Sequence, residues 1–354
     1  MNTTLNKTSQ YFRCVGHLYE TNLKREEAKL KQRNADGSEA PSVMGERIMG
    51  NLSVETDNGI HEFNVYAQNL TSDGKNSPTW DMYCKAMEWN PKVNGDSSVE
   101  PTLVNIEGTV EVNDYVNQNG EVKTTLRWRA GRANTKVDPE EVKGTTLKAT
   151  LFIGNVVPEI KNEEETGRLV VTLYGANGQG ECFPVTAIVD EEIADDFADA
   201  YEVGMTVPFE FELKSRQVGI KNGGGMKFGR KSKGPEVNQG YSVSELMLVG
   251  GQDEIEEPDE LTVEDENGNE VEVKTQWIDP KVMKKAIKLR QEKLDQLKAE
   301  GPKTKAKSGA KGTASSLAAA KKASKTTSSS KFGKASATME DDFADFGDDD
   351  DLPF

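Results

Sequence analysis

Short segments of alternating hydrophobicity recur along the first 250 residues, and this pattern constrains the fold more than any other feature of the chain. In the clearest segment, 104–112, Val104, Ile106, Val110 and Val112 share one parity, while polar residues and Gly occupy most other positions. A period of two is that of a β-strand with one buried face, because successive side chains point to opposite sides of the strand. The chain is therefore expected to be mainly β.

The expected strands fall into two sets of about five, at 9–135 and 145–250. In the first set, turn signals at 57–59 and 117–120 separate neighbouring strands, because Asn and Gly tolerate the positive φ of tight turns. In the second set, an acidic helical stretch at 190–201 lies between the third and fourth strands. A helix at that place in a five-stranded order is typical of the OB-fold, a small β-barrel.

We therefore expect an all-β protein with minor helices, built from two tandem five-stranded OB-fold barrels related by an old duplication. Residues 80–89 are the expected counterpart, in the first barrel, of the helix in the second. A single larger β-sandwich is the alternative that the pattern leaves open.

The chain beyond the barrels changes character several times. We expect an acidic connector at 251–278, a helix at 279–300, a disordered basic linker at 301–339 and an acidic tip at 340–354. Asp279 can cap the helix and Pro280 suits its first position. The narrow apolar stripe of this helix favours docking on the barrels, with a dimerising helix as the alternative.

Composition limits the kinds of function that the chain can have. It has a formal net charge of −16, so binding to nucleic acid requires its cations to gather on one face. Its N-terminus lacks the apolar stretch of a secretory signal. The sequence also has no run of 18 or more apolar residues, the length that a membrane-spanning helix needs. Cys14, Cys84 and Cys182 lie far apart, which favours reduced thiols in the cytoplasm over a metal site. No cofactor is expected.

The C-terminal tip, Asp348–Phe354, carries more than charge. Most acidic tails only improve solubility, but Phe354 combines an aromatic ring with the terminal carboxylate, and Pro353 restricts the backbone before it. Such a residue can enter an apolar pocket rimmed by cations, while the aspartates speed the encounter. The tip is therefore interpreted as a docking peptide for partner proteins.

The sequence of this tip closely resembles the end of bacterial and phage single-stranded DNA-binding proteins, in which an OB-fold core is followed by a disordered linker and an acidic tip. The resemblance implies docking on helicases, primases, polymerase subunits and recombination factors. The residues that would dock are Asp348, Asp349, Asp350, Asp351, Leu352, Pro353 and Phe354.

The chain also departs from the common bacterial form. That form has one shorter barrel and works as a tetramer, whereas two barrels and a Lys-rich linker are expected here, so the oligomeric state stays open. These departures favour a phage or plasmid replication protein, acting in the bacterial cytoplasm or in a phage-infected cell.

Two segments have the charge that a DNA strand requires. In 123–132 the period of two puts Lys123, Arg127 and Arg129 on one face, for which a solvated surface is the alternative. The segment 214–233 has seven Lys or Arg and no acidic residue, and it would join the last two strands of the second barrel, where OB-folds commonly bind oligonucleotides. The DNA-binding candidates are Lys123, Arg127, Arg129, Arg132, Lys214, Arg216, Lys221, Lys227, Phe228, Arg230, Lys231 and Lys233.

Aromatic rings on which bases could stack are less clear in the sequence. The candidates are Tyr66, Trp80, Tyr83, Trp89 and Tyr115, each of which could equally belong to a core.

No catalytic motif is recognised, so the chain is not expected to be an enzyme. The predicted function is sequence-independent binding and protection of single-stranded DNA in replication, recombination and repair, with recruitment of partners through the tip. A single-strand annealing recombination protein and an OB-fold scaffold or RNA-binding protein are the alternatives.

Overall fold

The computed structural model describes residues 5, 7–34, 38–117, 119–218, 241–258, 262–264, 270–272 and 275–301. The elements in chain order are β1 Gln10–Thr21, β2 Lys24–Arg33, β3 Glu39–Thr56, β4 Gly59–Gln68, α1 Pro78–Ala86, β5 Leu103–Val116, β6 Val122–Asn134, β7 Thr145–Lys161, β8 Glu164–Ala176, β9 Cys182–Val189, α2 Glu191–Ala200, β10 Thr206–Val218, β11 Tyr241–Gly251, β12 Thr262–Glu264, β13 Glu270–Glu272 and α3 Pro280–Glu300.

The first barrel is a closed ring of five strands. β1 pairs with β3, β3 with β4, and β5 with both β6 and β1, all antiparallel, while β4 and β6 pair in parallel and close the ring. The helix α1 lies between the third and fourth of these strands in sequence. Inside, Phe12, Phe63 and Ile106 are buried completely, as the alternating pattern requires.

The second barrel repeats the same connections. β7, β8 and β9 form an antiparallel meander, β9 and β11 pair in parallel, and β10 pairs antiparallel with β11 and β7. The helix α2 again separates the third and fourth strands. The expected all-β class with two OB-fold barrels and minor helices is therefore confirmed, and the β-sandwich alternative is wrong because each set of strands closes on itself.

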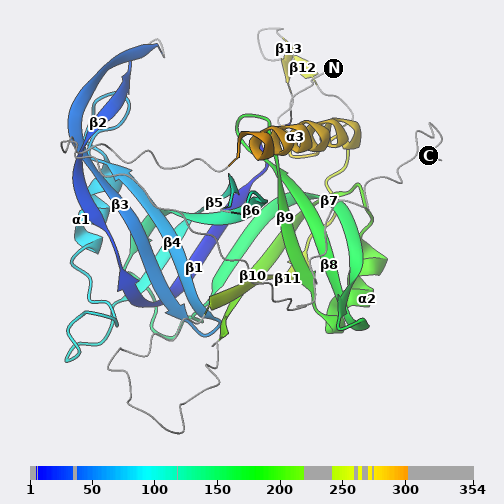
Figure 1. Cartoon of the computed structure of the whole chain (residues 1–354), viewed down its shortest axis with the longest axis horizontal. Coiled ribbons are helices and arrows are strands. Elements are labelled where there is room, and N and C mark those ends of the chain that lie inside the picture. The colour runs from blue at the N-terminus through cyan, green and yellow to red at the C-terminus, as the bar shows by residue number, and fades with distance from the viewer. Residues whose placement is uncertain are drawn as a thin grey trace, which may run out of the picture. The chain divides into compact units, whose positions relative to one another are not determined.

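A charged strand, β2, extends the first barrel and was not predicted. It pairs along the first part of β3, from Lys24↔Met49 to Arg33↔Glu39, and the two strands form a ribbon beside the barrel (Figure 1). Seven of its ten residues are charged, so it lacks the alternation by which strands are found in sequence.

Backbone hydrogen bonds join the two barrels directly. Their first strands, β1 and β7, pair antiparallel from Gln10↔Ala149 to Cys14↔Thr145, which makes one eleven-stranded sheet. A second contact lies at the turn between β3 and β4, where the amide of Ser215 on β10 donates to the carbonyl of Asn58 at 2.8 Å. The buried side chains of both barrels form one continuous core.

The helix α3 docks on the second barrel, against the middle of β7, the end of β8 and the start of β9 (Figure 1). Asp279 caps it, since its carboxylate accepts from the amide of Lys281 at 2.7 Å. Met283 is completely buried and packs in a cluster with Phe152 and Tyr174 of the barrel. In the described part of the chain, no helix is long and apolar enough to cross a membrane.

Candidate nucleic-acid interface

The basic segment of β6 lies on the outside of the first barrel. Lys123, Arg127 and Arg129 are exposed, whereas the ring of Trp128 points inward and meets Phe12 edge-on at 5.2 Å. The alternation predicted from sequence therefore separates cations from core in the folded strand.

Two of these cations have acidic neighbours. Arg129 pairs with Glu111 of β5 at 2.7 Å, and Lys123 pairs with Glu121 at 3.2 Å. All four side chains are at least 46% exposed, so these ion pairs contribute little and can exchange for phosphate contacts. Among the described residues, Arg127 has no ion-pair partner, because the carboxylate of Glu111 opposite it is bound to Arg129.

The parallel pairing of β4 and β6 brings these cations beside polar and aromatic side chains. Asn64 of β4 lies in register with Arg129, and Asn51 of β3 lies opposite Asn64. Further along the same side, Met49 lies opposite Tyr66, and each is 39% exposed. We call this surface the first-barrel face, made of Met49, Asn51, Asn64, Tyr66, Arg127 and Arg129. It lies on the second, third and fifth strands of the barrel, and the face of strands two and three is where OB-folds bind oligonucleotides.

The other stacking candidates differ in exposure. Trp80 is 7% exposed, and Tyr83 is completely buried, with its hydroxyl donating to the carbonyl of Ala130 at 2.9 Å. Trp89 is half-buried and packs against the core. Tyr115 is 42% exposed, at the outer end of β5. Of the five candidates, therefore, Tyr66 and Tyr115 present a ring to solvent.

Arg132 does not join the first-barrel face. It follows an extra residue in β6, lies opposite Glu107, and acts electrostatically on Tyr11 of β1. Burial raises the pKa of Tyr11, as do the hydrogen bond and charge of Glu107, while the charges of Arg13 and Arg132 act in the opposite direction.

The basic segment of the second barrel is described only at its ends. Lys214 is exposed on β10 and lies 3.8 Å from the carboxylate of Glu212, and Arg216 continues the backbone of the same strand. Val218 and Tyr241 lie opposite each other, and Ser215, on the same strand as Val218, donates from its amide to the carbonyl of Asn58. The candidates that lie outside the described residues are Lys221, Lys227, Phe228, Arg230, Lys231 and Lys233, together with the tip at 348–354.

The thiols of the described chain are free, and two of them are buried. Burial raises the pKa of Cys14 to about 12 and that of Cys182 to about 11, so both are protonated at neutral pH. In the described ranges, no group of three or more His, Cys, Asp and Glu side chains is placed to hold a metal ion.

Two closed five-stranded barrels that share one sheet, one of them with a basic and aromatic outer face, define a tandem OB-fold protein. The chain belongs to the YorF family, whose model matches residues 12–296, from β1 into α3. No curated protein matches its sequence.

Solved structures with some likeness include the wild-type single-stranded DNA-binding protein from Thermus aquaticus, at 11% identity and a TM-score of 0.36, over 72% of this chain and 97% of that chain. A deletion mutant of the same Thermus aquaticus protein gives 12% identity and a TM-score of 0.36, over 72% of this chain and 99% of that chain. Likeness at this TM-score does not bear on function.

Proposed function

We propose that this protein binds single-stranded DNA without base preference. The observation that carries the proposal is the first-barrel face, where exposed Tyr66 lies on the same side of the sheet as Arg127 and Arg129. Nonspecific binding of a single strand needs cations for the phosphates and an aromatic face for the bases. Asn64 adds an amide group that can donate to phosphate or base without selecting one sequence, whereas the amide of Asn51 donates to the exposed carboxylate of Glu62 on β4 at 2.9 Å.

The basic segment 214–233 supplies the charge that an acidic protein needs for this function. On the strand β10 where this segment begins, the amide of Ser215 donates to the carbonyl of Asn58, at the turn between β3 and β4. Cations in this segment would raise the local concentration of a polyanionic strand beside the first-barrel face.

Recruitment of replication, recombination or repair proteins through the tip is the second half of the proposal. It rests on the sequence Asp348–Phe354 and on its resemblance to the tips of bacterial and phage single-stranded DNA-binding proteins. A chain with this tip would coat an exposed strand and bring DNA-maintenance enzymes to it. The phage or plasmid origin belongs to the same proposal.

The test is fluorescence anisotropy with a labelled oligo-dT of about 30 nucleotides, its duplex and an RNA of equal length, across a salt series. We expect tight binding to the single DNA strand that weakens linearly in log salt, with a slope that reports the number of phosphate contacts. Equal affinity for RNA would favour the scaffold or RNA-binding alternative. Accelerated pairing of complementary strands in an annealing assay would favour the recombination alternative.

The stacking ring gives a sharper test of the same surface. Tyr66→Ala should weaken binding by about 1–3 kcal/mol, the contribution of one stacked base, and Tyr66→Phe should keep most of the affinity. Tyr11→Ala is the matched control, because Tyr11 is 44% exposed but lies on β1, away from the first-barrel face. Equal losses in Tyr66→Ala and Tyr11→Ala would contradict the assignment.

A further inference from the structure

The parallel strand pairs allow the outer faces of the two barrels to be compared position by position. In the first barrel Asn64 lies in register with Arg129, and in the second Ile188 lies in register with Met247. The next residue along β6 and along β11, Ala130 and Leu248, is buried in the core of its own barrel, so the two registers have the same inward and outward sides.

The neighbouring strands β3 and β8 are equivalent in the same way, since Asn51 lies opposite Asn64 and Val170 lies opposite Ile188. The equivalent pairs are Met49 with Arg168, Asn51 with Val170, Asn64 with Ile188, Arg127 with Glu245, and Arg129 with Met247. We call the second members of these pairs the second-barrel face.

The equivalent positions carry opposite chemistry. Where the first-barrel face has the cations Arg127 and Arg129, the second-barrel face has a carboxylate and a thioether that is 4% exposed. Where the first has two asparagines, the second has Ile188 and Val170, both half-buried. A phosphate backbone that finds donors and positive charge on the first barrel would find neither at these positions of the second.

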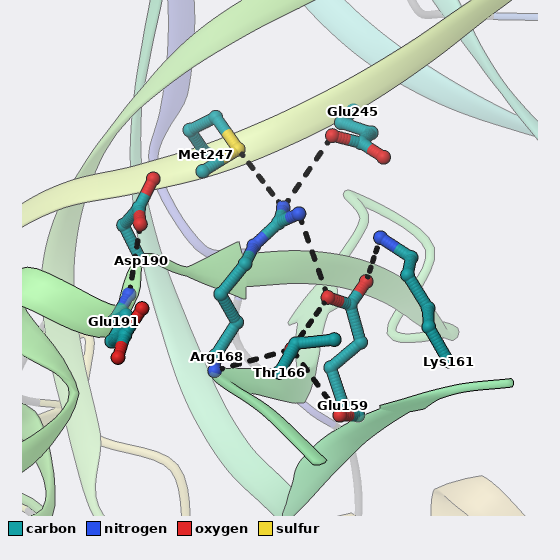
Figure 2. Close-up of polar contacts among 8 residues, drawn as sticks. All are labelled: Glu159, Lys161, Thr166, Arg168, Asp190, Glu191, Glu245 and Met247. Atoms are coloured by element: carbon teal, nitrogen blue, oxygen red, sulfur yellow. Dashed lines mark hydrogen bonds and ion pairs between the residues drawn. The ribbon is translucent and has the colours of Figure 1, made fainter. Parts of the chain in front are cut away.

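The one cation of the second-barrel face is engaged by the protein itself. Figure 2 shows Arg168 between two carboxylates, Glu159 at 3.5 Å and Glu245 at 3.4 Å, with the sulfur of Met247 at 3.7 Å. Its side chain is 20% exposed, against 46% for Arg129.

Glu159 is held in its charged form beside Arg168. Burial alone would raise the pKa of Glu159, but hydrogen bonds from Lys161 and Thr166 and the charge of Arg168 together lower it. The carboxylate therefore stays ionised at neutral pH and keeps Arg168 neutralised.

The end of the same sheet is covered by α3. Phe152 of β7, Tyr174 of β8 and Cys182 of β9 lie on the outer side of the barrel, and all are buried against Met283 and its neighbours on the helix. A groove of about 290 Å³ lies between α3 and the start of β9.

We propose that the two barrels have different roles, so that single-stranded DNA lies on the first-barrel face while the second-barrel face is a structural surface closed by the Arg168 ion pairs and by α3. This inference rests on the proposed function and names the barrel that performs it.

Substitutions at equivalent positions test the inference, with anisotropy on oligo-dT as the readout. Arg127→Ala should weaken binding by about three- to tenfold at low salt and lower the slope of log affinity against log salt by about 0.7, the contribution of one phosphate contact on a single strand. Its match, Glu245→Ala, should change the affinity by less than twofold and leave the salt slope unchanged within error. Asn64→Ala and Ile188→Ala form a second matched pair of substitutions, and neither of them changes the charge of the protein.

Hydrogen exchange of the wild-type protein gives a readout that needs no variant. Oligo-dT should slow the exchange of β4 and β6 while leaving β9 and β11 as they are in the free protein. Equal protection of both pairs of strands, or equal losses in Arg127→Ala and Glu245→Ala, would overturn the division of roles with DNA binding intact. A wild-type chain that binds no single strand at low salt would instead overturn the proposed function.

Discussion

His61 lies on β4, near the junction of the two barrels, and is 2% exposed. Its Nδ1 is 2.5 Å from the hydroxyl of Thr145 on β7, and its Nε2 is buried without a hydrogen-bond partner among the described residues. Burial lowers the pKa of His61 from 6.5 to about 4, while the backbone of Asn58, as an acceptor for the imidazole, acts in the opposite direction. The folded protein therefore holds this side chain neutral.

This burial predicts that the folded state loses stability in mild acid. Below pH 6.5 the unfolded chain takes up a proton at His61, whereas the folded chain does so only near pH 4, so stability present above pH 6.5 is lost as the pH falls between these values. A shift of this size corresponds to about 3 kcal/mol. Urea denaturation of the wild type and of His61→Gln at pH 7.5 and 4.5 measures it, and identical losses in the two proteins would contradict the role of His61.

Gly59 lies where the backbones of the two barrels approach each other closely. Its φ is +116°, and a Cβ at this position would lie 2.0 Å from the carbonyl oxygen of Ser215 on the second barrel. Gly59→Ala should therefore destabilise the fold by about 3 kcal/mol, since the backbones must separate as well as bear an unfavourable φ. Gly120→Ala is the control, because Gly120 has φ +80° and open space around it, and it should cost about 1 kcal/mol in the same denaturation experiment.

Among the elements, α3 links parts of the chain that are far apart in sequence. Arg290 donates to Asp114 of β5 at 2.7 Å and to the carbonyl of Cys182 on β9 at 3.5 Å, so the helix contacts both barrels. The two charged side chains are 13% and 19% exposed. Removing one of them leaves the other desolvated and unpaired.

Arg290→Ala should therefore lower the free energy of unfolding by about 2 kcal/mol, more than an exposed pair would. Asp114→Asn is the matched change on the other side, and a double-mutant cycle isolates the contribution of the pair. Lys293→Ala is a control, because its pair with Glu181 is at least half exposed and should contribute little. Strictly additive effects of Arg290→Ala and Asp114→Asn would show that the two residues do not stabilise each other.

The elements that were predictable from sequence are those with strong local signals. Alternation identifies β5, Asn and Gly identify the turns at 57–59 and 117–120, and Asp279 with Pro280 marks the start of α3. The strand β2 escaped prediction because its charges are held by cross-strand pairs such as Arg25 with Glu46, which a pattern along one strand does not contain.

The candidate site was predictable only in part. Its cations on β6 follow from a period of two, but the placement of Tyr66 and Asn64 beside them depends on a parallel pairing between strands about 65 residues apart. The pairing of β1 with β7 is a contact between domains, for which neither sequence segment carries a signal. The burial of Trp80 and Tyr83, against the exposure of Tyr66, likewise depends on which side of each element meets the core.

At the scale of the whole molecule, charge sets how a DNA strand competes with the protein's own acidic residues. The last 15 residues carry eight acidic side chains, and the chain as a whole has a net charge of −16. We expect removal of residues 340–354 to tighten binding to oligo-dT several-fold at low salt, with the difference fading toward 200 mM salt as screening shortens the range of the interaction. Removal of Leu352–Phe354 alone keeps every acidic side chain and should leave the affinity unchanged, whereas unchanged affinity after the longer deletion would exclude competition by the tip.

The pairing of β1 with β7 also decides what happens if the chain is divided. Residues Gln10–Cys14 of β1 pair with β7 along the same edge of β1 that pairs with β3 further along the strand. Residues Thr145–Ala149 of β7 pair with β1 along the same edge of β7 that pairs with β8 further along. A chain cut between 135 and 145 would give each fragment an unpaired stretch of strand, which is a template for association with another copy. Expressed singly, the halves of this protein would not behave as monomeric modules, and each would restore the lost edge by pairing with itself.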